Sequence, residues 1–321
     1  MTLNIAMLAT GRIAEHELAP ALSAAEGAQL WSVFSRDKNR AQSFAERHGA
    51  QSDSPAHTDL DALLADPALD AVLIATPDKL HAEQTIAAAR AGKHVLVEKP
   101  MATDRESGQA MIDACAEAGV KLGVAYHIRW HLGHRALIDE CAAGTFGELR
   151  HMRLQWSSQA PDASNWRAQT DVGRWWSLAG VGTHCLDQLR WFMRPHCGEI
   201  IEMKSVIANK TFGSPHDETA ILSFQFESGA TGEICTSVLF PGPRRFELYG
   251  SAGYALGENT LGPGGDGEIV THAGTFEYTS RNPYVGEIED FAQAVRDDRS
   301  PEVDGEEAMR NVDLLLKAVG A

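Results

Sequence analysis

A turn of small residues separates the first apolar run of the sequence from the first helical pattern. The run is Leu3–Leu8, and the turn after it reads Ala9-Thr10-Gly11-Arg12-Ile13-Ala14. Gly11 lets the backbone come close to a ligand, and Ala14 lets the helix pack closely on the strand. The first N–H groups of that helix have no partner within the helix, so they can bind a phosphate. The turn therefore predicts a site for a pyrophosphate, the group at the centre of a dinucleotide.

The residues after the second strand pattern indicate which dinucleotide is preferred. That strand is Leu30–Phe34, and Ser35 and Arg36 follow it. Proteins that bind NAD in this way place an acid near this point to accept the ribose 2′-hydroxyl. A hydroxyl and a guanidinium suit the 2′-phosphate of NADP instead. Asp37 lies one or two places late for the ribose, so the sequence favours NADP and leaves NAD open.

Strand and helix patterns alternate through the first part of the chain. Ala71–Ala75 is wholly apolar, as expected of a strand covered on both faces. Alternation at this spacing predicts a doubly wound parallel sheet of Rossmann type. The further strand patterns are His94–Val97 and Lys121–Ala125, and the helix patterns are Ile13–Ala25, Lys38–His48, Leu60–Leu64, His81–Ala91 and Asp104–Ala118.

The pattern changes after about residue 145, where longer segments alternate between apolar and polar residues. Ser228-Gly229 separates two of them and predicts a hairpin. One polar face indicates a mainly antiparallel open sheet in a second α/β domain. The strand patterns are Leu149–Ser157, Ile200–Asn209, Thr219–Phe226 and Thr231–Leu239; helices are expected at His184–Met193, Val285–Val295 and Gly305–Val319, and a loop at Gly257–Gly267.

These patterns divide the chain into two domains. We expect a dinucleotide-binding Rossmann domain over residues 1–122 and a substrate-binding and oligomerisation domain over residues 123–321. The last helices are expected to pack back on the Rossmann domain.

The bulk composition excludes several kinds of partner. The 321 residues suffice for two hydrophobic cores, and the formal net charge is -16. A surface of that sign repels phosphate backbones and anionic lipid, so we expect neither nucleic acid nor membrane as a partner. The N-terminus lacks the basic and apolar regions of a signal peptide, and no apolar stretch is long enough to cross a bilayer.

Five cysteines are present, at positions 115, 141, 185, 197 and 235, with wide spacings and no CxxC motif. Neither a disulfide framework nor a zinc site is indicated. We therefore expect reduced thiols in a cytoplasmic protein and no bound metal.

Two segments are rich in residues that bind sugars. They read Tyr126-His127-Ile128-Arg129-Trp130-His131 and Asn165-Trp166-Arg167, the second followed by Arg174-Trp175-Trp176. Aromatic faces pack on the C–H surfaces of a sugar, while Arg, His and Asn bond its hydroxyl groups or a carboxylate. Four of the seven tryptophans of the chain lie here, although each of them is equally suited to a hydrophobic core.

Five motifs, in this order, resemble the Gfo/Idh/MocA family, the group of glucose–fructose oxidoreductase and inositol dehydrogenase. The family resemblance implies an N-terminal Rossmann domain and a second domain with a predominantly antiparallel sheet, whose open face commonly forms a homodimer or homotetramer. The motifs are Ala9-Thr10-Gly11-Arg12-Ile13-Ala14; Ala75-Thr76-Pro77 with His81; Ala91-Gly92-Lys93-His94-Val95-Leu96-Val97-Glu98-Lys99-Pro100; Gly182-Thr183-His184-Cys185-Leu186-Asp187; and Tyr249-Gly250-Ser251-Ala252-Gly253.

The resemblance also implies roles for single residues. Lys99 matches the catalytic lysine of the family, and His184 matches its general acid or base. Asp187 matches a second acid that orients His184 or lines the site. The cofactor residues implied are Ala9, Gly11, Arg12, Ile13, Ser35, Arg36, Thr76, Pro77, His81, Glu98 and Lys99; the expected substrate residues are Tyr126, His127, Arg129, Trp130, Asn165, Trp166, Arg167 and Thr183.

The sequence departs from the family at one position. The family usually has an Asp four residues before the histidine, and here Gly180 occupies that place. We expect an NADP-preferring oxidoreductase that moves hydride between the nicotinamide and a sugar, sugar acid or polyol. Gly180 motivates one alternative, a sensor that binds cofactor and sugar without turnover. The family resemblance implies a second, a glycosidase assisted by transient oxidation of the sugar. The sequence does not name the sugar.

Overall fold

The structure, a computed structural model, describes residues 2–169 and 173–320. The chain divides into two compact units. Unit 1 comprises residues 1–127 and 284–312, and unit 2 comprises residues 128–283 and 313–321. The first boundary lies a few residues beyond the position expected from the sequence, and a C-terminal segment returns to unit 1.

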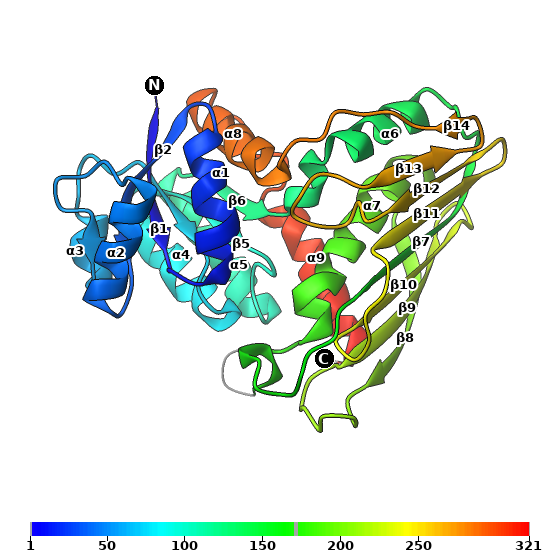
Figure 1. Cartoon of the computed structure of the whole chain (residues 1–321), viewed down its shortest axis with the longest axis horizontal. Coiled ribbons are helices and arrows are strands. Elements are labelled where there is room, and N and C mark those ends of the chain that lie inside the picture. Colours follow the sequence, from blue (N-terminus) through cyan, green and yellow to red (C-terminus); the bar gives the residue numbers. More distant parts are fainter. Residues whose placement is uncertain (1, 170–172, 321) are drawn as a thin grey trace. The chain divides into compact units, whose positions relative to one another are not determined.

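Unit 1 is built on a parallel sheet, shown in blue and cyan in Figure 1. Within the described residues it has six strands in the order β3-β2-β1-β4-β5-β6. Every residue of β4 and β6 is buried, because helices cover both faces of such a sheet. The strands are β1 (Leu3–Leu8), β2 (Ala28–Phe34), β3 (Ala56–His57), β4 (Ala71–Ile74), β5 (His94–Glu98) and β6 (Leu122–Ala125).

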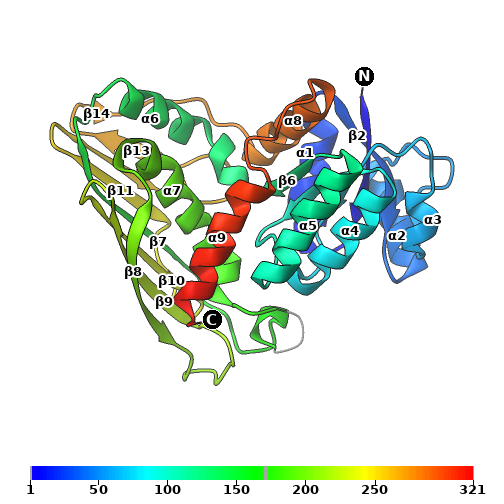
Figure 2. The ribbon, with the colours of Figure 1, turned by 180° about the vertical axis from the view of Figure 1, so that it is seen from behind.

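Helices cover both faces of this sheet. Figure 2 shows α4 and α5 side by side, whereas α1 and α8 lie over the other face in Figure 1. Leu22 of α1 and Phe291 of α8 contribute to one buried cluster there. The helical segments are η1 (Ala14–Leu18), α1 (Ala19–Ala24), α2 (Lys38–His48), α3 (Leu60–Leu64), η2 (Asp78–Leu80), α4 (His81–Arg90), α5 (Arg105–Ala118), α8 (Pro283–Arg296) and α9 (Gly305–Ala318), the last divided between the units at residue 312.

Unit 2 is built on a second, mostly antiparallel sheet. Its eight strands among the described residues follow the order β14-β13-β12-β11-β7-β10-β9-β8, and β7 and β10 pair in parallel. The strands are β7 (Leu149–Ser157), β8 (Ile200–Ala208), β9 (Thr219–Phe226), β10 (Thr231–Ser237), β11 (Arg245–Gly250), β12 (Tyr254–Glu258), β13 (Glu268–Thr271) and β14 (Gly274–Thr275), and the helical segments are η3 (His127–Trp130), α6 (Leu132–Ala142), η4 (Trp166–Ala168), η5 (Leu178–Gly182) and α7 (Thr183–Cys197).

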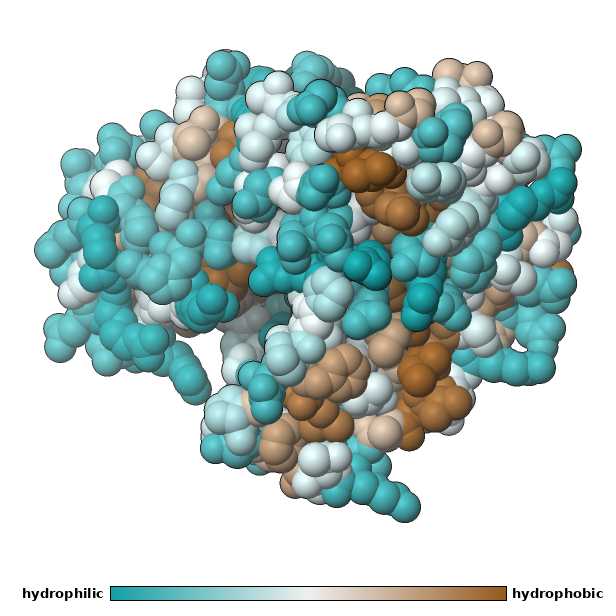
Figure 3. Space-filling model, turned by 45° about the vertical axis from the view of Figure 1, so that its right-hand side comes forward, coloured by the Kyte–Doolittle hydropathy of each residue, from teal (hydrophilic) through white to brown (hydrophobic). Residues whose placement is uncertain are grey.

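Only one face of the second sheet is covered. Burial alternates along β9, as its sequence predicts, and α7 packs so closely on β10 that a Cβ at Gly232 would lie 2.7 Å from Leu189. On β8 and β9 the side chains of Ile201, Val206 and Ile221 are 57%, 65% and 48% exposed. Figure 3 shows one side of the molecule, where apolar patches lie within a largely hydrophilic surface.

The expected hairpin at Ser228-Gly229 is confirmed, since β9 and β10 pair antiparallel across it. The expected loop Gly257–Gly267 begins two residues late, because β12 continues to Glu258. Gly257 is there for close contact rather than for a turn: a Cβ at this position would lie 2.1 Å from the ring of Phe246.

Candidate active site

The carboxyl ends of the strands of unit 1 bring most predicted cofactor residues to one edge of the sheet. Gly11 follows β1, Ser35 follows β2, Thr76 follows β4 and Lys99 follows β5. The strand order reverses between β1 and β4, and dinucleotides bind at such a reversal. Tyr126, which follows β6, reaches the same edge.

The turn after β1 fits a pyrophosphate. A Cβ built on Gly11 would meet no atom within 4 Å, so the backbone there is open to a ligand. The N–H of Glu15 already donates to the Gly11 carbonyl at 2.9 Å, which places the helix start directly at the turn. Ala9 has a φ of 140°, a region that favours glycine, at the place where the fingerprint usually has its first glycine.

Asp37 is engaged in capping a helix. Its Oδ1 accepts the N–H groups of Asn39 at 2.9 Å and of Arg40 at 3.2 Å, which starts α2. Ser35 is half-buried and Arg36 is exposed at the end of β2. The hydroxyl and the guanidinium are therefore presented at the strand end, while the carboxylate is occupied by backbone donors.

Glu98 and Lys99 end the strand β5. Their side chains are only 7% and 9% exposed, because β5 lies between β4 and β6. The Lys99 N–H donates to Oε2 of Glu98 at 3.2 Å, and the peptide bond between Lys99 and Pro100 is cis. The Glu98 carboxylate is thus held by the backbone at the edge where ligands of parallel sheets gather, and Lys99 is the next residue in the chain.

His81 lies beneath this edge with no exposed surface. Its Nδ1 is 3.0 Å from the carbonyl oxygen of Pro100, and its Nε2 is 3.0 Å from that of Thr76. The ring therefore joins two segments that the sequence assigns to the cofactor. A direct contact of His81 with a cofactor, as the sequence suggested, does not fit a ring that is buried in this way.

A tyrosine that the sequence did not single out lies near Glu98. Tyr284 of α8 stacks on His127, with ring centroids 4.0 Å apart and planes 17° apart. Burial raises the pKa of the Tyr284 hydroxyl well above its usual value; the carboxylate of Glu98 acts in the same direction and Arg12 opposes it. No local pattern marks Tyr284, because only the fold brings α8 to this place.

In unit 2, His184 lies at the start of α7. This helix continues directly from the π-helix η5, and Thr183 and His184 are both buried. The His184 ring stacks on Trp156 of β7 at a centroid distance of 5.6 Å and an angle of 25°. The stacking fixes the plane of the imidazole that the sequence assigns to proton transfer.

Asp187 and Arg129 form a buried ion pair. Nε of Arg129 donates to Oδ2 of Asp187 at 2.8 Å, and Nη2 donates to Oδ1 at 2.6 Å. The two side chains are 5% and 1% exposed. Such a bidentate pair fixes both partners. Arg129 was expected to bind substrate, and its guanidinium instead bonds Asp187. Asp187 lies one helical turn after His184.

A second carboxylate, which the sequence did not reveal, holds the start of the His184 segment. Asp217 accepts the N–H of Trp176 at 2.9 Å, the hydroxyl of Ser177 at 2.6 Å and the N–H of Leu178 at 2.7 Å. Burial raises its pKa, while these three donors lower it. Asp217 follows a polar loop and precedes β9, so no sequence signal distinguishes it from a solvated residue.

Gly180 leaves room beside the same segment. A Cβ built there would meet nothing within 4 Å. The acid that the family usually has at this place would therefore find space.

The tryptophans of the predicted substrate segments divide into two groups. Trp175 and Trp176 are 0% and 2% exposed, and Nε1 of Trp175 donates to the carbonyl of Leu315 at 3.2 Å. They belong to the core of unit 2.

Trp166 is half-buried, and the guanidinium of Arg167 lies 4.1 Å from its ring centroid. The side chain of Asn165 accepts the Arg167 N–H. Trp130 is 9% exposed, with Arg135 over its ring.

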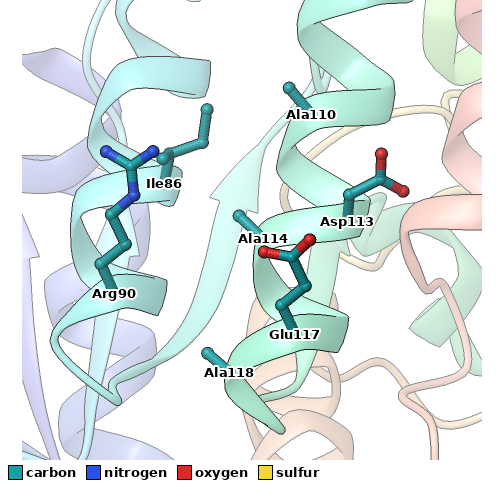
Figure 4. Close-up of a pocket in the computed structure, with 7 residues that line it drawn as sticks. All are labelled: Ile86, Arg90, Ala110, Asp113, Ala114, Glu117 and Ala118. Atoms are coloured by element: carbon teal, nitrogen blue, oxygen red, sulfur yellow. The ribbon is translucent and has the colours of Figure 1, made fainter.

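A groove of about 400 Å³ between α4 and α5 lies apart from these residues (Figure 4). Ile86 and three alanines line it, with Arg90 on one side and Asp113 and Glu117 on the other. None of the predicted site residues contributes to it.

Across residues 2–169 and 173–320, no group of three or more His, Cys, Asp or Glu side chains is arranged to hold a metal ion. A helix long and apolar enough to cross a membrane is likewise absent from this part of the chain.

The fold and the strand-end residues define a dinucleotide-binding protein with a second domain, and comparison with known proteins identifies the family. Residues 3–126 match the oxidoreductase family with an NAD-binding Rossmann fold, Gfo/Idh/MocA, and residues 134–256 match the C-terminal domain of that family. The chain therefore belongs to the Gfo/Idh/MocA oxidoreductases, as the sequence motifs predicted.

Several characterised proteins are similar along nearly the whole chain. D-xylose 1-dehydrogenase (NADP(+)) 2 of Haloferax volcanii is 30% identical, covering 97% of this chain and 96% of its own. 1,5-anhydro-D-fructose reductase of Ensifer adhaerens is 27% identical, covering 92% and 90%. The crystal structure of aldose-aldose oxidoreductase from Caulobacter crescentus superposes with a TM-score of 0.92 at 22% identity, covering 99% and 97%, and shows that the fold is shared.

Proposed function

We propose that this oxidoreductase moves hydride between NADP and a carbinol or carbonyl carbon of a sugar, sugar acid or polyol. The observation that carries the proposal is the place of Glu98 and Lys99, which are both buried at the carboxyl end of β5 in a Rossmann unit. The names of the xylose and anhydrofructose relatives support the substrate class.

Different residues of this chain would bind the cofactor, bind the substrate oxygen and transfer the proton. A bound nicotinamide supplies the hydride acceptor or donor. Lys99 donates a hydrogen bond to the substrate oxygen and favours the alkoxide that develops there during oxidation. His184 takes the hydroxyl proton, since an imidazole is suited to proton transfer near neutral pH. The carboxylate of Glu98 accepts a hydrogen bond from a hydroxyl of the nicotinamide ribose. Asp187 is held by Arg129 and thereby fixes the position of α7, the helix that carries His184.

The preference for NADP rests on the end of β2. The hydroxyl of Ser35 and the guanidinium of Arg36 would suit a 2′-phosphate, and Oδ1 of Asp37 accepts the first N–H groups of α2. We expect Arg36→Ala to weaken NADP binding about tenfold while NAD binding changes little, measured by quenching of protein fluorescence. An equal effect on both cofactors would remove Arg36 from the 2′-phosphate site.

Gly180 supports a second candidate, a sensor that binds cofactor and sugar without turnover. A side chain at position 180 would meet nothing within 4 Å of its Cβ, yet the chain carries no carboxylate there. A glycosidase assisted by transient oxidation fits the same residues. Cofactor that copurifies, with cleavage of an aryl glycoside and no net reduction, would select that alternative.

We further propose that copies of the chain associate through the open face of the second sheet as a homodimer or homotetramer. The exposed Ile201, Val206 and Ile221 support this assignment. The double substitution I201K and V206K should yield monomers in analytical ultracentrifugation; an unchanged assembly would place the interface elsewhere. The few, widely spaced cysteines are our ground for proposing the cytoplasm as its compartment.

The proposed reaction is tested by following the absorbance of the reduced nicotinamide. NADP and NAD are tried separately against D-xylose, uronic acids, inositols and, with the reduced cofactors, 1,5-anhydro-D-fructose. Turnover with one sugar and a higher kcat/KM with NADP is the expected result. Binding of both cofactors in a thermal-shift assay without any turnover would favour the sensor.

A further inference from the structure

The ring of His81 faces two groups that can only accept hydrogen bonds. Each ring nitrogen has a backbone carbonyl oxygen at 3.0 Å, that of Pro100 at Nδ1 and that of Thr76 at Nε2. A neutral imidazole carries one N–H and one bare nitrogen. In either neutral tautomer, the bare nitrogen would point its lone pair at a carbonyl oxygen. Only an imidazolium, which has two N–H groups, satisfies both contacts.

The two carbonyls belong to the segments that matter for the proposed reaction. Thr76 follows β4, beside the turn that fits the pyrophosphate, and Pro100 follows Lys99 at the end of β5. The side chain of Thr76 is also tied to α4, since its hydroxyl donates to Oε1 of Gln84 at 2.7 Å. His81 and Gln84 thus hold the Thr76 segment from the same helix.

The surroundings of the ring decide whether a buried cation is tolerable. His81 stands in the first turn of α4, where the helix dipole opposes a positive charge. The two carbonyl dipoles point their negative ends at the ring and offset that cost. The charged side chains on the adjoining stretches are Asp78 and Lys79 of η2, Glu83 and Arg90 of α4, and Glu98 and Lys99 at the end of β5. Carboxylates and other cations are equal in number there, so the two carbonyl oxygens are what favours the charge on the ring.

We propose that His81 is a buried imidazolium that bridges the Thr76 and Pro100 carbonyls and thereby positions Lys99. The functional half of this proposal depends on the proposed role of Lys99. His81 is a positioning residue: it has no exposed surface from which to touch a ligand. Its two donors fix the course of the chain on both sides of the strand end, and an error of about 1 Å in such a placement costs roughly a hundredfold in rate.

The charge state is tested without any turnover. Long-range ¹H–¹⁵N spectra of protein labelled with ¹⁵N-histidine are compared at pH 7.5 between wild type and His81→Phe, so that the signals lost identify His81. We expect both ring nitrogens of His81 to carry a proton. One nitrogen without an attached proton would overturn the imidazolium. His94→Gln, at the other end of β5, is the matched control, and it should leave the His81 signals in place.

The positioning role is tested by kinetics on the sugar of the panel that gives wild type its highest rate. His81→Phe keeps a ring and removes both donors, whereas His81→Gln keeps a donor group. We expect kcat to fall about a hundredfold in His81→Phe and less in His81→Gln, with KM for NADP within about threefold of wild type. A His81→Phe enzyme with kcat within about threefold of wild type would show that the ring only fills space. If wild type itself turns over no sugar, the proposed reaction fails, while the spectra still decide the charge state.

Discussion

The two units hold their proposed catalytic residues with buried side chains of opposite sign. In unit 1, Lys99 follows a strand end where carbonyl oxygens need donors, and the ring of His81 supplies them. In unit 2, His184 belongs to a segment whose first N–H groups need acceptors, and the carboxylate of Asp217 supplies them. Backbone groups buried without a partner are costly, so the kind of element that carries the catalytic residue decides which side chain must support it.

Unit 2 also supports α7 with a buried ion pair. The buried pair of Arg129 and Asp187 anchors α7 one turn beyond His184. Removing one partner of a buried ion pair leaves an uncompensated charge. We therefore expect the segment that carries His184 to be sensitive to the loss of a single charge.

The largest expected effect is on stability, from Arg129→Ala. We expect the free energy of unfolding to fall by about 3–5 kcal/mol, because Asp187 then stays buried without its cation. Urea denaturation followed by circular dichroism measures it. The control is Arg47→Ala, which removes the partially exposed pair with Glu15 and should cost less than about 1 kcal/mol. Equal losses in the two variants would contradict the special role of the buried pair.

A smaller loss is expected from Asp217→Ala. Three donors at the start of the His184 segment lose their acceptor, at a cost of about 1–3 kcal/mol. Asp217→Asn keeps one acceptor oxygen and should recover part of the loss. Asp162→Asn, at an exposed turn, is the control and should change the urea midpoint little. Wild-type urea midpoints in both the Ala and the Asn variant would show that Asp217 does not stabilise this segment.

Acid should weaken unit 2 through His134. Burial holds the pKa of His134 well below its usual value, and the neighbouring His131 adds to this effect. The unfolded chain then binds more protons than the folded one, so stability is present above about pH 6.5 and falls as the pH drops below it. The slope for one such histidine reaches about 1.4 kcal/mol per pH unit. Urea midpoints from pH 7.5 to 5 should fall less steeply in His134→Leu; identical slopes would exclude His134 as the cause.

The smallest expected effect is a gain, from Ala9→Gly in unit 1. The φ of 140° at Ala9 costs an alanine of order 1–3 kcal/mol, while the extra freedom of glycine in the unfolded chain costs about 0.4–1 kcal/mol. We expect a net stabilisation of about 1 kcal/mol, seen as a higher urea midpoint. A lower midpoint would show that the backbone at this turn is not strained.

The same comparison explains how much could be predicted from the sequence. The doubly wound sheet, the hairpin of β9 and β10 and the family follow from apolar periodicity and from motifs, which are local signals. The strands β11 to β13 and the helix α6 were not predicted, since β11 is interrupted by charged residues and β12 by a glycine that the Phe246 ring requires.

The contacts that surround the predicted site residues could not be predicted where the fold brings distant residues together. Arg129 looks like a sugar-binding cation in its segment, and only the fold shows Asp187 beside it. The sequence suits Trp175 and Trp176 equally to a sugar site and to a core, and only the fold shows that they are buried in the core. Asp217 and Tyr284 carry no local signal, because their roles depend on elements far away in the chain.

The most direct test of the central claim is the turnover of Lys99→Ala. We predict that its kcat on the preferred sugar falls by about a hundredfold to a thousandfold, because a donor to the developing alkoxide is lost. Binding of NADPH should change by less than about threefold, and Lys93→Ala, which removes a buried lysine bonded to the carbonyls of Asp66 and Leu69, should keep its turnover. A Lys99→Ala enzyme that reduces or oxidises nicotinamide at the wild-type rate would contradict the account.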